Sequence, residues 1–367
     1  MKTKLLLLML TGCLLALTAW LVHVPTSVQA DEIPEKYRDT VRKGLEFLVK
    51  SQHKDGHWEG DDGKHPVAMT GLAGLALLLA GEARYEAHIS KAADWLIDKG
   101  QPNRDGLIFS EHPSETSRYM QGHGLATLFL AGVSKQERDD ARGKKLTDTL
   151  MRTVKYIVKA QSTQGGWYNT SKVEGHDFDT ISATVIQIQA LQAAENAGIP
   201  VPREAVNDAQ DYLKAALAKK DEQAKAGQNR SRPADTAAAL AARFNPDTIQ
   251  INATVKPYAM ADELCKKWLK YCQAEIPVGR DIKFGRDELT HYYFAQTMSN
   301  VGGETWTGYR TTMFDHLQSS QNKDGSWPAG DGISVGPVYS TALWCTILQL
   351  DKRNHPLIRP ARSAIVT

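Results

Sequence analysis

The chain has 367 residues, of which 42% are hydrophobic and 23% are charged, and its formal net charge is +2. This is the composition of an ordinary globular protein, and it argues against a disordered chain, a collagen-like fibre and a membrane protein with several spans. The charge balance is nearly neutral and no basic stripe stands out, so the sequence predicts no nucleic-acid partner.

The first 30 residues differ from the rest. Two lysines precede an apolar run over residues 5–24, and the small-residue end Val28-Gln29-Ala30 precedes an acidic pair. This pattern is typical of a signal peptide over residues 1–30, and it predicts export to the periplasm or the cell exterior, with a single domain over residues 31–367. The apolar run is about 20 residues long, so an uncleaved anchor that associates the protein with a membrane stays open as an alternative.

Cleavage after residue 30 would remove two lysines and no acidic residue, which would lower the net charge from +2 to 0. Cys265, Cys272 and Cys345 would remain. Cys265 and Cys272 stand in a helical stretch, about 10 Å apart along its axis. That separation is too long for a disulfide, so we expect the fold to depend on its core rather than on bridges.

One short pattern occurs three times in the chain. It reads QHKDGHW at residues 52–58, QSTQGGW at residues 161–167 and QNKDGSW at residues 321–327. Patterns that recur inside one chain are typical of folds built from stacked units. We expect the glycine to allow a left-handed turn, the tryptophan to fill the gap between adjacent outer helices, and the glutamine to bond to backbone at a helix end.

Each copy stands between an amphipathic helix and an apolar helix rich in small residues. The sequence predicts six outer helices, over residues 36–51, 89–99, 146–161, 204–219, 261–273 and 311–321. It predicts six inner helices, over residues 69–81, 120–132, 179–191, 235–243, 290–298 and 338–350. Six such pairs can bury their apolar faces on their neighbours and close into a ring, so we expect an all-α fold.

The Gln-to-Trp turns with their alternating helices resemble the repeats of squalene–hopene cyclases and of protein prenyltransferase β subunits, over about residues 36–350. The resemblance implies an (α/α)6 toroid, in which the inner helices surround an apolar cavity with the chemistry at one mouth. A triterpene cyclase of this kind carries a second, similar domain, and this chain has room for one ring. The resemblance is more specific for the fold than for the reaction.

The segment His176-Asp177-Phe178-Asp179-Thr180 stands where the resemblance places the Asp-x-Asp-Asp-Thr motif of class II terpene cyclases. Neither alignment register retains the full motif, and Asp177 and Asp179 are the candidate catalytic residues. A carboxyl group that protonates an alkene needs a raised pKa and support from its neighbours. The alternative is that Asp179, like Asp235, caps its helix by accepting a backbone hydrogen bond.

The resemblance to prenyltransferases implies a zinc site made by an Asp, a Cys two positions later and a His from the next inner helix. Asp235 and His291 occupy comparable places, but Ala237 stands where the thiolate would be. Two protein ligands make a poor zinc site, because catalytic zinc generally keeps three. We therefore expect neither a metal nor another cofactor, and His291 is alternatively a side chain of the cavity wall.

The starts of the inner helices should converge at one mouth, where their positive dipole ends favour anions. We expect six polar side chains to cluster there, namely His123, His176, Asp177, Asp179, Asp235 and His291. Aromatic residues on or beside the inner helices add candidate ligand contacts, among them Phe178, Tyr292, Tyr293 and Tyr339. Their rings can stabilise a carbocation or stack on a sugar, although filling the core is the alternative role.

Three functions remain open from the sequence. The first is a protein that binds an apolar or isoprenoid-like small molecule, or a protein partner, in or on the ring, since both catalytic motifs are degraded. The second is an enzyme that acts on an isoprenoid substrate through Asp177, Asp179 and the aromatic lining. The third is a polysaccharide-active enzyme, because α/α toroids also carry such chemistry.

Overall fold

A computed structural model describes residues 33–100, 105–137, 139–225, 232–243, 263–278, 287–330 and 335–352. The chain divides into two units, of which Met1–Asp31 lies outside the described residues, together with the predicted signal peptide. The second unit is helical, and extended backbone within its described parts pairs only at two isolated bridges.

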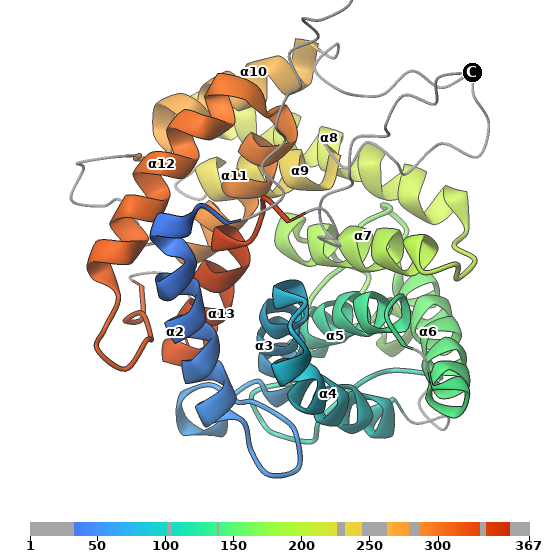
Figure 1. Ribbon diagram of the computed structural model, residues 1–367. Coiled ribbons are helices and arrows are strands. Elements are labelled where there is room, and N and C mark those ends of the chain that lie inside the picture. The colour runs from blue at the N-terminus through green and yellow to red at the C-terminus, as the bar shows by residue number, and fades with distance from the viewer. Residues whose placement is uncertain are drawn as a thin grey trace, which may run out of the picture. The chain divides into compact units, whose positions relative to one another are not determined.

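Twelve α-helices alternate between two layers along the described residues (Figure 1). The outer helices are α2 (Glu35–Ser51), α4 (Glu86–Lys99), α6 (Asp140–Ala160), α8 (Arg203–Lys225), α10 (Glu263–Glu275) and α12 (Gly303–Ser320). The inner helices are α3 (Pro66–Ala80), α5 (Tyr119–Ser134), α7 (Ile181–Asn196), α9 (Arg232–Arg243), α11 (Glu288–Val301) and α13 (Pro337–Leu348). This arrangement confirms the predicted all-α toroid and its six helix pairs.

The two layers differ in how their helices are buried. In α2 the buried positions recur every three or four residues, so only one face meets the core. In α3 every residue except Ala68 is buried, because α2 and α4 cover one side while α5 and α13 pack against others. Close packing of α3 on α5 requires small residues, since a Cβ at Gly74 would lie only 2.7 Å from the ring of Phe129.

Some helix starts differ from the predicted ones by a few residues. Helix α3 begins at Pro66 and α13 at Pro337, since a proline is pre-organised for the first position of a helix. Helix α6 begins at Asp140, because the side chain of Asp139 accepts a hydrogen bond from the backbone N–H of Arg142. Local capping chemistry sets these boundaries.

The three Gln-to-Trp turns make the same hydrogen bonds. The indole N–H of Trp58, Trp167 and Trp327 donates to the carbonyl of Leu48, Ile157 and Leu317, at 2.7, 2.8 and 2.9 Å. The amide of Gln52, Gln161 and Gln321 donates within its own turn and also to the next outer helix, at the carbonyls of His88, Ala205 and Thr40. The predicted equivalence of the three tryptophans is therefore confirmed, and all three are fully buried.

The turn glycines are required both by conformation and by space. Gly56 has φ +105, and a Cβ there would lie 2.5 Å from the carbonyl oxygen of Lys91 in α4. Gly165 and Gly325 make the same close approach to the next outer helix, with φ +91 and +94. Only glycine combines this backbone conformation with such proximity.

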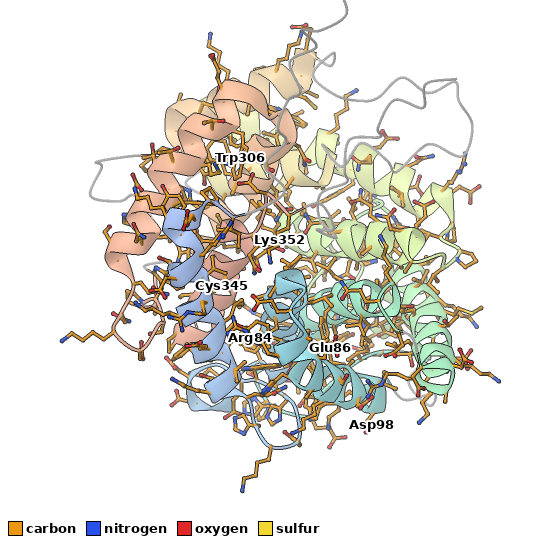
Figure 2. All side chains as sticks on the ribbon, viewed as in Figure 1. Arg84, Glu86, Asp98, Trp306, Cys345 and Lys352 are labelled. Atoms are coloured by element: carbon orange, nitrogen blue, oxygen red, sulfur yellow. The ribbon has the colours of Figure 1, made fainter. Side chains whose placement is uncertain are left out.

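The ring closes where the last helices meet the first (Figures 1 and 2). The amide of Gln349 donates to the carbonyl of Ala76 at 2.9 Å, and Lys352 Nζ donates to the carbonyl of Ala80 at 2.7 Å. In the outer layer, Tyr37 of α2 donates its hydroxyl hydrogen to Asp315 of α12 at 2.7 Å. An open solenoid is thereby excluded.

Cys265, Cys272 and Cys345 are buried and form no disulfide, as the helical spacing predicted for the first two. Within the described residues, no helix has both the length and the apolarity that a membrane span requires.

Candidate functional site

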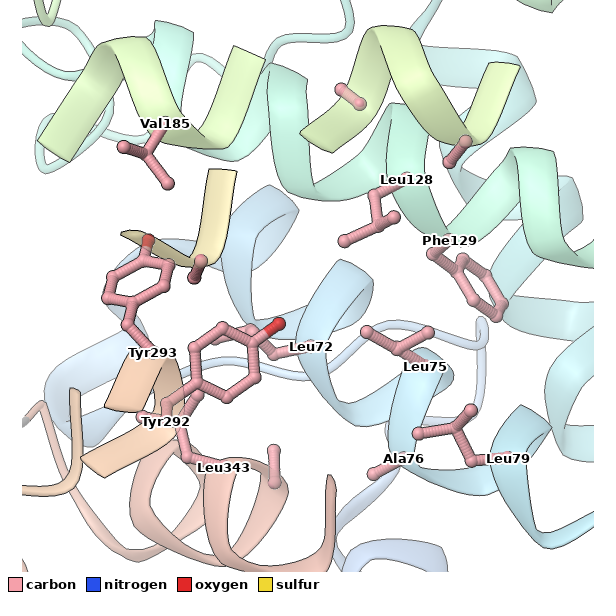
Figure 3. Close-up of a cluster of buried hydrophobic side chains, with 14 of the residues drawn as sticks. Leu72, Leu75, Ala76, Leu79, Leu128, Phe129, Val185, Tyr292, Tyr293 and Leu343 are labelled. Carbon is pink, nitrogen blue, oxygen red and sulfur yellow. The ribbon is translucent and has the colours of Figure 1, made fainter. Parts of the chain in front are cut away.

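Side chains from five inner helices point toward one another inside the ring (Figure 3). Leu72 and Leu75 come from α3, Leu128 from α5, Val185 from α7 and Leu343 from α13, and all are buried. These side chains, called the interior surface below, belong to one buried apolar cluster, and its members lie far apart in the sequence.

Two tyrosines of α11 complete this interior surface. Tyr292 and Tyr293 are 2% and 3% exposed, and their ring centroids lie 5.2 Å apart in an edge-to-face arrangement. In Figure 3 the hydroxyl of Tyr292 points toward Leu72 and Leu75. That hydroxyl has no partner at hydrogen-bond distance within the described residues; burial raises its pKa, and the nearby side chain of Gln296 lowers it. A buried hydroxyl without a partner is costly, so its position calls for an explanation.

Tyr339 of α13 lies near the same pair. Its pKa is raised well above the ordinary value, first by burial and then by the charge of Glu288 and by Tyr293, Asp287 and Tyr292. Of the predicted ligand-binding residues, the structure thus brings together Tyr292, Tyr293 and Tyr339.

Two buried carboxylates that no sequence pattern predicted lie at the starts of inner helices, Glu288 in the first turn of α11 and Glu115 against the first turn of α3. Glu288 accepts hydrogen bonds from the Ser340 hydroxyl at 2.8 Å and from the backbone N–H of Gly330 at 3.1 Å. Glu115 accepts hydrogen bonds from the backbone N–H of Val67 at 2.8 Å and of Ser110 at 3.2 Å. No motif marks either residue, because Val67, Gly330 and Ser340 come from other segments of the chain.

Burial raises the pKa of Glu115 to about 7, although hydrogen bonds from backbone N–H groups lower it. The group stands at the first turn of α3. A carboxyl group with this pKa can hold or release a proton near neutral pH.

His123 and His291 face the outer helices and not this interior surface. His123 accepts the backbone N–H of Ile108 on Nδ1 at 3.0 Å, and its Nε2 lies 3.3 Å from the carbonyl of Thr153 in α6. The Nδ1 of His291 lies 3.0 Å from the hydroxyl of Tyr309 in α12. Burial lowers the pKa of His123 to about 4 and that of His291 to about 3. Both histidines are therefore neutral near pH 7.

The loop before α7 holds His176, Asp177, Phe178 and Asp179. The carboxylate of Asp177 accepts hydrogen bonds from the backbone N–H and the hydroxyl of Thr163, at 2.8 and 2.6 Å, and these bonds lower its pKa. His176 Nδ1 lies 2.8 Å from the Thr170 hydroxyl, and Phe178 is 60% exposed.

Asp179 is the more buried carboxylate of this loop. Its pKa is raised, mainly by burial and further by the charge of Asp177, although the hydroxyl of Ser162 lowers it. The expectation that Asp179 caps α7 is wrong, because the cap is Thr180, whose hydroxyl accepts the backbone N–H of Ala183 at 3.3 Å.

Asp235 lies in the first turn of α9, inside the helix and not before it. Asp179 and Asp235 both flank Tyr212 of α8, because each raises its pKa in addition to the main effect of burial. The six polar residues expected at the mouth therefore do not form one cluster. Asp179 and Asp235 lie near Tyr212 of α8, and Asp177 is bonded to Thr163, while His123 and His291 lie within separate helix contacts.

The prenyltransferase-type metal position also differs from a zinc site. Ala237 is buried and offers no ligand atom. Among the described residues, the one group of His, Cys and acidic ligand atoms within metal-binding distance consists of His53, His57 and Glu59. That group includes neither Asp235 nor His291.

Comparisons with known proteins agree with this architecture. A family model described as the squalene-hopene cyclase C-terminal domain matches residues 17–183. A crystal structure of a protein from Actinoplanes has a TM-score of 0.55 at 14% identity, and the alignment covers 85% of this chain and 98% of that chain. Over residues 17–183 the chain is therefore similar to this family, and the Actinoplanes structure shows the same fold.

Type II terpene cyclase structures are also similar to this chain. The cyclase MstE from Scytonema, without ligand, has a TM-score of 0.48 at 15% identity, covering 87% of this chain and 99% of that chain. A variant of MstE in complex with geranylgeranyl dihydroxybenzoate has a TM-score of 0.44 at 11% identity, covering 87% and 97%. No curated protein sequence matches the chain.

Proposed function

We propose that this protein binds an isoprenoid-type molecule inside the ring, against the interior surface of α3, α5, α7, α11 and α13. The single observation that carries the proposal is the Tyr292 hydroxyl, which is buried, makes no hydrogen bond within the described residues and points toward Leu72 and Leu75. A ligand that accepts a hydrogen bond there would satisfy it.

The chemistry of the interior surface supports a prenyl chain with one polar group. Leucine and valine side chains offer apolar contact without direction, which suits a branched hydrocarbon. The faces of Tyr292 and Tyr293 suit double bonds, or positive charge that develops on them. The family match over residues 17–183 points to the same class of molecule.

The test uses the chain with Tyr292→Phe and two probes, geranylgeraniol and squalene. Removing an unsatisfied hydroxyl should raise the free energy of unfolding of the free protein by about 1 kcal/mol, while the affinity for geranylgeraniol falls about tenfold. Squalene has no oxygen, so its binding should not change. Phe178→Ala, whose ring is 60% exposed, is the control and should bind both probes like the wild type. If neither probe binds to the wild type, the proposal is refuted.

A second candidate function is proton-initiated cyclisation of such a molecule. The observation that favours it is the pair Asp177 and Asp179, whose surroundings lower one pKa and raise the other. Paired carboxyl groups with separated pKa values are typical of acid–base sites. Phe178 and Thr180 depart from the cyclase motif, and this argues against cyclisation.

Incubation with squalene and geranylgeraniol, followed by mass spectrometry of the products, tests this second function. Asp179→Asn should abolish product formation and leave ligand binding intact, since an amide does not donate a proton to an alkene. The absence of any product from the wild type would leave the protein as a binding protein.

We also propose that the mature protein is exported and begins at Asp31, on the pattern of residues 1–30. Intact mass spectrometry of protein from the native host tests this. A mass that includes residues 1–30 would favour the anchor instead.

A further inference from the structure

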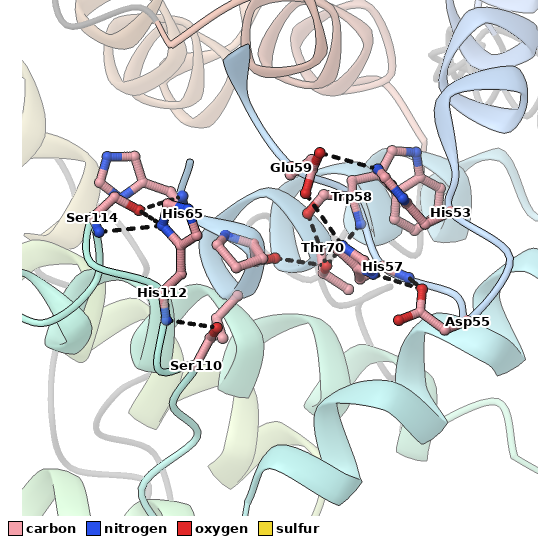
Figure 4. Close-up of polar contacts among 12 residues, drawn as sticks. His53, Asp55, His57, Trp58, Glu59, His65, Thr70, Ser110, His112 and Ser114 are labelled. Atoms are coloured by element: carbon pink, nitrogen blue, oxygen red, sulfur yellow. Dashed lines mark hydrogen bonds and ion pairs between the residues drawn. The ribbon is translucent and has the colours of Figure 1, made fainter. Parts of the chain in front are cut away.

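The first Gln-to-Trp turn carries three metal-ligating side chains, His53, His57 and Glu59 (Figure 4). His53 Nε2 lies 3.3 Å from Glu59 Oε1, and His57 Nε2 lies 3.5 Å from Glu59 Oε2. The three ligand atoms all lie within 4.8 Å of one another. Two ligands of a tetrahedral zinc ion lie roughly 3.4 Å apart, because each stands about 2.0–2.1 Å from the metal. The distances to Glu59 therefore match a chelate with little rearrangement.

The backbone of the turn brings these side chains together. The backbone N–H of His53 donates to the carbonyl of His57 at 2.9 Å, so the two imidazoles project side by side and stack with centroids 4.3 Å apart. The other two turns have the same bond and the same length, from Ser162 to Gly166 and from Asn322 to Ser326. The turn itself thus needs no histidine at either position.

A comparison within the chain shows that the three ligands are specific to this turn. The residues that correspond to His53, His57 and Glu59 are Ser162, Gly166 and Tyr168 in the second turn, and Asn322, Ser326 and Pro328 in the third. The structural positions of the motif, Gln, Gly and Trp, are the same in all three. Metal-binding residue types thus occupy three positions that the fold leaves free.

Asp55 orients one of the ligands. Its Oδ1 lies 2.6 Å from His57 Nδ1, so Nδ1 carries the hydrogen and Nε2 presents its lone pair toward Glu59. A neutral imidazole in this tautomer cannot donate a hydrogen bond to Glu59, and two acceptors would face each other. Either a second proton, on Nε2, or a divalent cation between Nε2 and the carboxylate satisfies both groups, and only the cation draws in His53 as well. Carboxylate–histidine–metal arrangements of this kind fix the ring and raise its basicity as a ligand.

Trp95 of α4 stacks on His57 with ring centroids 4.9 Å apart, which holds the imidazole from its other face. The side chains of His53 and Glu59 are 45% and 34% exposed, so solvent reaches the site. We propose that His53, His57 and Glu59 bind one divalent transition-metal ion of the Zn²⁺ class, with the remaining coordination position open to water or to an anionic group. Two histidines with one carboxylate are a common ligand set for such ions.

The experiment titrates Zn²⁺ alone into the untagged full chain, stripped with a chelator, by isothermal calorimetry. We expect one equivalent to bind, and Zn²⁺ to raise the melting temperature because it binds the folded state. Co²⁺ in place of Zn²⁺ should give a visible absorption band of a low-coordinate site. No saturable binding of either ion to the wild type would overturn the proposal.

The double variant His53→Asn, His57→Ser places in this turn the residues that the third turn has at 322 and 326. It should melt like the metal-free wild type, lose the Zn²⁺ equivalent and lose the thermal shift. Asp55→Asn should weaken binding about 10–100-fold, as is typical when a residue that orients a ligand is changed. Lys54→Ala, an exposed residue of the same turn, is the matched control and should bind like the wild type. Equal Zn²⁺ affinity in the double variant would place the metal elsewhere and refute the site.

Discussion

His123 Nδ1 accepts the backbone N–H of Ile108 at 3.0 Å. In the three Gln-to-Trp turns a threonine hydroxyl accepts the corresponding hydrogen bond from the backbone N–H of the tryptophan. The pairs are Thr70 with Trp58 at 3.0 Å, Thr184 with Trp167 at 3.0 Å and Thr341 with Trp327 at 3.2 Å. Ile108 follows Gly106 by two residues, as tryptophan follows glycine in the three Gln-to-Trp turns, so His123 has there the structural role of a threonine. The longer imidazole also reaches α6.

His123→Ala should lower the free energy of unfolding by about 3 kcal/mol. It leaves the buried N–H of Ile108 without an acceptor and opens a cavity between α5 and α6. His123→Thr restores an acceptor of the type that the other turns use, so its loss should be smaller. Urea denaturation at pH 7 measures both. Equal losses in the two variants would show that the hydrogen bond contributes little.

Acid should destabilise the protein through the same histidine. Burial lowers the pKa of His123 from 6.5 to about 4, so between these values the unfolded chain binds a proton that the folded chain does not. Its contribution is complete above pH 6.5 and is lost as the pH falls toward about 4, by about 1.4 kcal/mol per unit.

Glu115 acts in the opposite direction, because its pKa is raised from 4.5 to about 7 and its stabilising protonated form is lost as the pH rises through that range.

The difference in the free energy of unfolding between the wild type and His123→Ala isolates the contribution of the histidine. The penalty of His123→Ala should therefore be about 2 kcal/mol smaller at pH 5 than at pH 7. A penalty that does not change with pH would contradict the buried, neutral imidazole.

Each of Trp58→Ala, Trp167→Ala and Trp327→Ala should lower the free energy of unfolding by about 3–5 kcal/mol, because each ring is fully buried and its N–H is bonded to backbone. Phe178→Ala is the control for loss of an exposed ring, and its effect should stay within about 0.5 kcal/mol. Losses below about 1 kcal/mol at all three tryptophans would mean that the turns are not structural.

Thr180→Ala and Asp179→Asn separate the cap from its neighbour. Thr180→Ala should cost about 1 kcal/mol, because α7 loses the hydroxyl that accepts the N–H of Ala183. Asp179→Asn should leave stability nearly unchanged, since it removes a carboxylate that Asp177 repels. Thermal unfolding in parallel measures both, and the reverse order of the two effects would restore Asp179 as the cap.

The sequence by itself determined the helices and their closure into a ring. The turn signature requires a glycine at positive φ, a buried tryptophan and a bonded glutamine, and these demands are local enough to be read from three copies. The amphipathic pattern of α2 likewise identified it as an outer helix, because one face alone is apolar.

Only the tertiary structure decided which side of an inner helix each polar residue faces. Helices such as α3 and α5 are apolar all round, so their periodicity does not separate the side toward the ring interior from the side toward the outer layer. His123 and Tyr292 both stand on inner helices near their starts, yet one bonds to the outer layer and the other points inward. The hydrogen bond that Glu115 accepts from Val67 and the group around Tyr339 depend on contacts between distant segments, and such contacts leave no pattern along the chain.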